Sequence, residues 1–165
     1  MYESKKILSF DFVKAGKFIL SGEPCQFKNW QSHVLLKLID EKFERADETA
    51  YVIICETTIL YVGEYAYNLR DRWHSKNYVN HHMHNNIKSA LEEGRELSLW
   101  VAISPYIEIT EIENPELREL NLSKSLEQHI LKHYLPEWNL RNKNSSAKEW
   151  RKKHSIRLDS FIKNP

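Results

Sequence analysis

Two short apolar runs, separated by three polar residues, constrain this chain more than any other feature. Residues 51–55 (YVIIC) and 59–62 (ILYV) consist of β-branched, aromatic and small apolar side chains, which are typical of strands. Gly63 follows the second run at a position where a backbone without Cβ is useful. The stretch therefore predicts a hairpin of two buried strands.

The register of this hairpin decides whether Tyr51 and Tyr61 lie on the same face. They do so when Ile53 is opposite Tyr61, because side chains alternate between faces along a strand. A two-residue turn alone would put the two tyrosines on opposite faces. A shared face, which the family resemblance described below requires, therefore predicts either the three-residue connection 56–58 or a β-bulge.

A helix is predicted directly after the hairpin. Asn68 is a typical N-cap, and Asp71 places a carboxylate in the first turn, where it meets the positive end of the helix dipole. This helix carries Arg72. Periodicity and breakers predict the other elements: helices over 29–44, 80–93 and 123–134, a strand over 97–104, an edge strand or loop over 106–113, helical turns over 115–120, and a hairpin or short helix within 1–27.

Glu127 lies within the apolar stripe of the predicted helix 123–134. At about 100° per residue, Leu126, Ile130 and Tyr134 fall on the same side as this carboxylate. An ionised carboxylate that points toward the protein body is costly unless it is paired or binds a cation. The pattern leaves two readings open, a metal ligand or an ion pair with a buried arginine such as Arg72.

Composition fits a single soluble domain in a reducing compartment. The chain has 165 residues, 41% hydrophobic and 28% charged, and no apolar run of membrane-spanning length. The N-terminus lacks the apolar core of a signal peptide, and two cysteines make no disulfide framework, so we expect a cytoplasmic protein without membrane contact.

The charge is unevenly distributed along the chain. The net charge is +1, but the segment from Arg141 onward carries eight lysines and arginines against two acidic residues. Such a segment is either a surface for a polyanion or a solvated tail, and the composition does not separate the two.

The order of these features resembles the GIY-YIG nuclease superfamily. A strand tyrosine, the strand end Tyr61-Val62-Gly63, a helix with Arg72, a third strand and then Glu127 with Asn139 twelve residues on, after Pro136, follow the pattern of that family. The resemblance covers about residues 48–140. The size of the whole chain is similar to that of small restriction endonucleases of this family. It implies an α+β fold, with a small three-stranded antiparallel sheet flanked by helices.

The resemblance also implies a division of the chain and a set of substrates. Residues 1–47 would be an N-terminal extension that contacts the target, forms dimers or covers the sheet, 48–140 the nuclease core, and 141–165 a basic C-terminal segment of one compact domain. The expected activity is Mg²⁺-dependent (or Mn²⁺-dependent) cleavage of double-stranded DNA by a homodimer or higher oligomer, most simply as a restriction-type enzyme. A repair or structure-specific nuclease, a non-catalytic nucleic-acid-binding module and an interaction protein stay open.

The family pattern assigns chemistry to individual residues. Tyr51 would be the general base, with its pKa lowered by nearby cations, and Tyr61 would orient the attacking water or hold the scissile phosphate. Arg72 would stabilise charge on the phosphoryl oxygens, Glu127 would bind the metal ion, and Asn139 would brace the site. His74 and Lys76 are further site candidates, and the expected DNA contacts are Arg70, Arg141, Lys143, Arg151, Lys152 and Lys153.

The run His81-His82-Met83-His84 raises the question of a zinc site. On a helix His81 and His84 are neighbours, whereas His82 points elsewhere, and no cysteine lies near them in sequence. We therefore expect a polar surface near the phosphate rather than a structural zinc ion.

Overall fold

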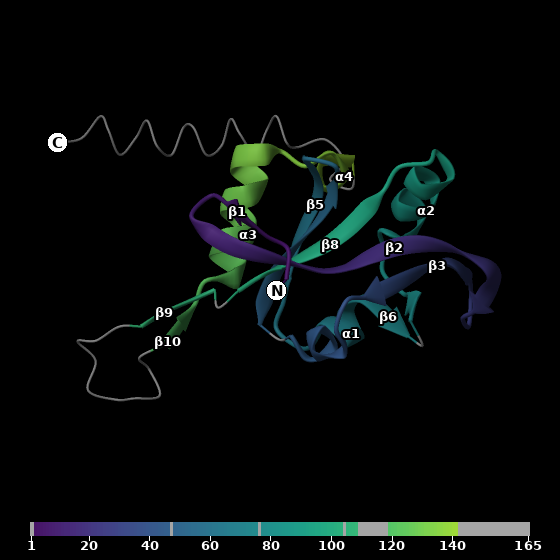
Figure 1. The fold of residues 1–165 in the computed structure, drawn as a ribbon, viewed down its shortest axis with the longest axis horizontal. Coiled ribbons are helices and arrows are strands. Elements are labelled where there is room, and N and C mark those ends of the chain that lie inside the picture. Colours follow the sequence, from purple (N-terminus) through teal and green to yellow (C-terminus); the bar gives the residue numbers. More distant parts are fainter. Residues whose placement is uncertain (1, 47, 76, 104, 109–118, 142–165) are drawn as a thin grey trace.

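A computed structural model gives the architecture of the chain (Figure 1). It describes residues 2–46, 48–75, 77–103, 105–108 and 119–141. Within these ranges, no helix is long and apolar enough to cross a membrane.

One curled antiparallel sheet organises the described part of the chain (Figure 1). Its strands run in the order β5-β4-β8-β2-β3-β7-β6, and β1 pairs with the start of β2. The strands are β1 Ser4–Ile7, β2 Phe10–Gln26, β3 Gln31–Leu38, β4 Thr49–Cys55, β5 Thr58–Tyr65, β6 His74–Ser75, β7 Tyr78–Val79 and β8 Leu97–Ala102. A separate two-stranded sheet pairs β9 (Tyr106–Glu108) with β10 (Glu119–Asn121).

The helices of the described ranges are short. They are the 3₁₀ turn η1 (Glu41–Arg45) and the α-helices α1 (Leu69–Trp73), α2 (His84–Glu92), α3 (Ser123–Tyr134) and α4 (Glu137–Arg141). The predicted helix 123–134 is confirmed. The helix predicted over 80–93 is shorter, over His84–Glu92, and Gly94 after it adopts a positive φ of 78° and donates its N–H to Leu91. Asn68 caps α1 by accepting the N–H of Asp71 at 2.9 Å, as predicted.

The predicted fold class is wrong. The predicted strands β4, β5 and β8 do lie side by side, but the sheet does not stop at three strands. β2 pairs with the outer edge of β8, with Phe12 opposite Ala102 and Val13 opposite Val101, and β3 then pairs with β2. Residues from the predicted N-terminal extension thus form the middle of the sheet.

The predicted helix over 29–44 is also wrong. Ser32, Val34 and Leu36 are buried in alternation with less buried neighbours, which is the period of a strand. The apolar spacing of this stretch fits both periods, and pairing with β2 selects the strand. Likewise Glu119 and Leu120, which were predicted in a helical turn, lie in β10, while residues 115–118 are outside the described ranges.

The hairpin has the predicted register, by way of a β-bulge. Cys55 pairs with Thr58 across a two-residue turn, in which Glu56 has a φ of 53°. Between the pairs Ile54–Ile59 and Ile53–Tyr61 the register shifts by one residue. The extra residue, Leu60, restores Tyr61 to the same face as Tyr51.

The two faces of the sheet carry separate apolar clusters. Tyr51, Tyr61 and Trp73 belong to the cluster that includes α1 and α2. On the other face, Val52 and Trp100 pack with the α3 cluster. The aromatic hydroxyls of the candidate site therefore lie on the face covered by α1 and α2.

Candidate functional site

Tyr51 is fixed at the centre of a polar cluster inside the core. Its side chain is fully buried, and its ring meets that of Trp73 edge-on at 5.2 Å. The hydroxyl oxygen accepts a hydrogen bond from Nε of Arg72 at 2.8 Å and lies 3.5 Å from Nε2 of His81. Strand β4 and helix α1 thus deliver a phenol and a guanidinium to the same point.

The protonation of His81 follows from its other ring nitrogen. Nδ1 accepts the backbone N–H of Met83 at 3.1 Å, so the neutral imidazole carries its proton on Nε2, toward Tyr51. The ring is stacked on Trp73 at 4.0 Å and 17°. Burial, and secondarily Arg72, lowers the pKa of His81 to about 2, so the imidazole is neutral at pH 7.

Tyr61 is the second phenol of the site. Its ring centroid lies 6.3 Å from that of Tyr51, and its hydroxyl lies 3.4 Å from Nε2 of His82. His82 is exposed, whereas His81 is buried. The pair Tyr61–His82 therefore links the buried cluster to solvent.

Gly63 is required by the ring of Tyr51. A Cβ at Gly63 would lie 2.6 Å from the Tyr51 hydroxyl oxygen and 2.7 Å from Cζ. Since Gly63 is paired with Tyr51 across the hairpin, the ring folds over the glycine. This contact gives the glycine of the sequence motif a steric reason.

The expected lowering of the Tyr51 pKa is not what the cluster produces. Burial raises the pKa of Tyr51, and the neighbouring Tyr61 adds to the rise, while Arg72 opposes it. The same factors act on Tyr61: burial raises its pKa, Arg72 lowers it, and the Glu127 carboxylate raises it. Both phenols are neutral at pH 7 in the protein alone.

Glu127 lies on α3, which packs on the opposite face of the sheet, and its carboxylate is linked to the site through its electrostatic effect on Tyr61. Its neighbours Leu126 and Ile130 are buried, while Glu127 itself is half-buried and its carboxylate lies 3.4 Å from Nε2 of Gln128. Its effect on the Tyr61 pKa shows that the carboxylate is within electrostatic range of that phenol. A single carboxylate can contribute to binding Mg²⁺ or Mn²⁺, because these ions take oxygen ligands and keep several waters.

Asn139 braces the strand that carries Tyr61. Its Oδ1 accepts the N–H of Val62 at 2.9 Å and its Nδ2 donates to the Val62 carbonyl at 2.8 Å. The amide thus pairs with an edge-strand residue as another strand would. α3 ends at Tyr134, and the next residue, Leu135, turns the chain with a φ of 51°. The N–H of Asn139 donates to the carbonyl of the buried Pro136. This turn and this hydrogen bond place the Asn139 amide against β5.

The other predicted site residues are not brought into this cluster or are not described. Arg70 is exposed and forms an ion pair with Glu44 at 3.5 Å. For His74 and Arg141 the structure describes only the backbone, and the predictions for Lys76, Lys143, Arg151, Lys152 and Lys153 lie outside the described residues. Within the described ranges, no group of three or more His, Cys, Asp and Glu side chains is arranged to hold a metal ion.

Sequence reasoning missed the contacts of His81 and Trp73 with Tyr51. His81 had been considered only as a zinc ligand or as part of a polar surface, because a run of histidines carries no signal of burial. Trp73 directly follows Arg72 at the end of α1. A large apolar residue next to the proposed site arginine was the sequence signal that could have indicated a buried aromatic contact.

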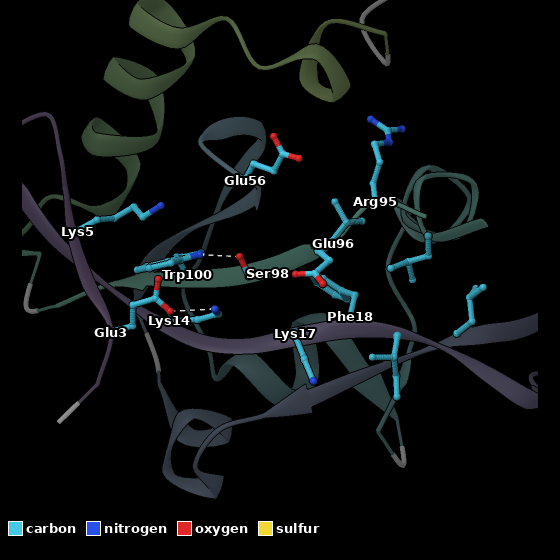
Figure 2. A pocket seen from close by; sticks show the side chains of 14 residues that line it. Glu3, Lys5, Lys14, Lys17, Phe18, Glu56, Arg95, Glu96, Ser98 and Trp100 are labelled. Atoms are coloured by element: carbon cyan, nitrogen blue, oxygen red, sulfur yellow. Dashed lines mark hydrogen bonds and ion pairs between the residues drawn. The ribbon is translucent and has the colours of Figure 1, made fainter. Parts of the chain in front are cut away.

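A hollow on another part of the described structure lies apart from this cluster. It has a volume of about 470 Å³ and is lined by Trp100, Ser98, three lysines and three glutamates among others (Figure 2). Lys14 is paired with Glu3 at 2.9 Å, and Lys5 lies over the Trp100 ring at 4.2 Å. Lys14 and Lys5 therefore each have a partner within the hollow.

Comparison of the chain with protein-family models, curated proteins and solved structures found no match.

Proposed function

We propose that this protein is a metal-dependent endonuclease that hydrolyses phosphodiester bonds in DNA. The observation that carries the proposal is the convergence of Tyr51, Tyr61 and Arg72 from three elements, with the Glu127 carboxylate within electrostatic range. The motif resemblance to GIY-YIG nucleases assigns these same four residues to one site.

The chemistry follows from what each group can donate or accept. A water attacks phosphorus while the bond to the leaving oxygen breaks; the Tyr51 phenolate takes one proton of the water, and the leaving oxygen takes a proton from solvent. The guanidinium of Arg72 opposes the negative charge that builds on the phosphoryl oxygens. A divalent ion held by Glu127 would polarise the phosphoryl group.

Tyr61 and His82 provide a path for protons to solvent. The Tyr61 hydroxyl contacts the neutral imidazole of His82, whose pKa is lowered by burial and by Arg72. Through this contact the proton accepted inside the cluster reaches solvent, and Tyr51 returns to its starting state.

The test is cleavage of plasmid and genomic DNA with Mg²⁺ by the wild type and by Tyr51→Phe, Arg72→Lys and Glu127→Gln. Loss of a general base costs about 10²–10⁴-fold in rate, and loss of one transition-state donor about 10²–10³-fold. Tyr78→Phe and Glu92→Gln, which alter a phenol and a carboxylate outside the cluster, should leave cutting unchanged.

Two results would overturn the proposal. Binding of DNA without metal-dependent cutting would instead support the non-catalytic module. Cutting that persists in all three site variants would show that the chemistry belongs to other residues or to a contaminating nuclease.

A further inference from the structure

A second hollow borders the candidate site. It has a volume of about 380 Å³ and is lined by Trp30, Gln31, Asn80, His81, His82, His84 and Asn85. His81 and His82 are shared between this hollow and the site, since they contact the hydroxyls of Tyr51 and Tyr61 at 3.5 and 3.4 Å. Whatever occupies the hollow is therefore adjacent to the proposed scissile phosphate.

An aromatic wall closes one side of this hollow. Trp30 follows the turn between β2 and β3, and Phe27 stacks against it at 4.8 Å and 15°. The N–H of Phe27 donates to the Trp30 carbonyl at 2.8 Å, and the indole meets the His84 ring at 5.0 Å. The indole is therefore supported by neighbouring rings while remaining half-buried at the border of the hollow.

His84 is also held in place. Its Nε2 accepts the backbone N–H of His33 at 3.1 Å, so Nδ1 carries the proton and donates to Oδ1 of Asn85 at 3.0 Å. These bonds tie the start of α2 to β3. The walls of the hollow thus come from segments that the sheet and its hydrogen bonds position before any ligand binds.

The lining is polar but uncharged. Among its described residues there is no Asp, Glu, Lys or Arg, and three side-chain amides supply donors and acceptors. Burial lowers the pKa of each of His81, His82 and His84, so the imidazoles are neutral at pH 7. A phosphate would find no counter-charge here, whereas a neutral aromatic ring with a hydrogen-bonding edge fits both features.

We propose that this hollow binds the nucleobase next to the scissile phosphate, stacked on Trp30 and hydrogen-bonded by the amides. The inference rests on the proposed nuclease function and names its substrate more closely. A base in a duplex is stacked on its neighbours and paired, so it enters only when it is unpaired or turned out of the helix. The enzyme therefore prefers DNA with an unpaired nucleotide at the cut.

Binding in EDTA tests the inference without cleavage. The full-length protein is titrated with hairpin oligonucleotides whose single-stranded loop contains one abasic residue, moved through each loop position in turn. Base–aromatic stacking is worth about 1–3 kcal/mol, which is about 5- to 150-fold in affinity. The wild type should lose affinity in that range at one loop position and little at the others.

Variants assign the loss to the indole. Trp30→Ala should weaken binding of the intact loop in the same range and show no further loss at the sensitive abasic position, while Trp30→Phe keeps most of the affinity. Tyr134→Ala, which removes an exposed aromatic side chain from α3, is the matched control and should bind as the wild type does. The abasic series uses the unaltered protein, so it decides the question even if Trp30→Ala fails to fold.

The outcomes separate this inference from the proposed function. Equal affinity for every abasic loop, or an equal loss by Trp30→Ala on intact and abasic loops, overturns the base site while leaving metal-dependent cutting untouched. Failure of the wild type to cut any DNA with Mg²⁺, with the abasic position still sensitive, overturns the nuclease and keeps a base-binding site.

Discussion

At the scale of single residues, burial governs the acidity of the proposed base. The same packing that fixes Tyr51 against Trp73 and Gly63 raises the pKa of its phenol. Arg72 offsets part of this rise, because a positive charge at 2.8 Å favours the phenolate. Only a small fraction of Tyr51 is deprotonated at pH 7, and in the proposed mechanism this fraction limits proton abstraction.

The first prediction is a rise of activity with pH. Because the pKa of Tyr51 is raised, the phenolate fraction grows about tenfold per pH unit throughout the range below that pKa. The logarithm of kcat/KM for DNA cleavage should therefore rise with a slope near one between pH 7 and 9. The residual activity of Tyr51→Phe should lose this slope, and an optimum below pH 7 would contradict the assignment.

The second prediction concerns Gly63→Ala. The new Cβ would lie 2.6 Å from the Tyr51 hydroxyl oxygen, so the ring must move and its bond to Arg72 is lost. We expect a loss of about 1–3 kcal/mol in the free energy of unfolding, measured with denaturant, together with loss of cutting. Gly22→Ala is the control, since nothing lies within 4 Å of the added Cβ, and an active Gly63→Ala would show that the contact is not needed.

At the scale of elements, the hairpin and α4 depend on one another. β5 is the edge strand of the sheet, and Asn139 supplies the donor and acceptor that its Val62 lacks on that side. Trp138 beside it is buried in the same cluster as Tyr61. The position of Tyr61 is therefore set by a helix that lies 77 residues further along the chain than Val62.

The third prediction compares Asn139→Asp with the wild type. The carboxylate introduced by this substitution still accepts the N–H of Val62, but its second oxygen faces the Val62 carbonyl and cannot donate. We expect the free energy of unfolding to fall by about 1–3 kcal/mol, since a partly buried acceptor is left without its donor. The measurement is denaturant unfolding at pH 7, and unchanged stability would contradict a bracing role.

The elements with strong local signals were predicted well. The runs 51–55 and 59–62 and the helix before Pro136 formed as predicted. The strand predicted over 97–104 also formed, over Leu97–Ala102. The tyrosine register was predicted by combining residue alternation with the requirement, taken from the family resemblance, that both tyrosines lie on one face, and the β-bulge confirms it. The strand β3 was mistaken for a helix because Trp30, Val34 and Leu38 fit a helical period, and pairing with β2, which no local pattern contains, decided otherwise.

The histidines of the site could not be placed by sequence reasoning. The polar residues His81 and His84 are buried through contacts with Trp73, Trp30 and β3. No local sequence pattern links the histidines to these partners, and Trp30 and β3 are distant from them in the chain. The resemblance-based fold failed for a related reason, since it covered residues 48–140 and contained no information on β2, the strand that continues the sheet past β8.

At the scale of the whole molecule, the sheet makes the N-terminal segment part of the core. β2 lies between β8 and β3, and Phe12, Ala15 and Phe18 on it are buried. The Trp30 wall of the second hollow belongs to the same segment. Residues of the N-terminal segment and of the proposed catalytic cluster therefore fold as one unit.

The fourth prediction is that a fragment of residues 48–165 does not fold. Without β2, the backbone N–H and C=O groups of β8 on that side lose their partners. The apolar side chains that pack against Phe18 and Val13 also become exposed to water. We expect a chain without a cooperative thermal transition in circular dichroism, in contrast to the full-length protein. A cooperative transition in the fragment would show that the predicted core 48–140 is independent after all.

The fifth prediction is acid sensitivity that traces to His81. Its folded pKa is lowered, so below about pH 6.5 the unfolded chain takes up a proton that the folded chain refuses. Stability is thus fully present above pH 6.5 and falls by about 1.4 kcal/mol per pH unit as the pH decreases, or about 2 kcal/mol by pH 5. His81→Gln should flatten the dependence measured by urea unfolding, whereas His133→Gln, an exposed site on α3, should leave it unchanged.

The amide of Asn139 has a consequence for how copies of this molecule meet. The outermost strand of a β-sheet can pair with a strand of another copy, because its outer N–H and C=O groups have no partner within the sheet. Here a side chain already occupies those positions at Val62, beside Tyr61 of the proposed site. At this residue the edge of the sheet is therefore not available for pairing with a strand of a second copy.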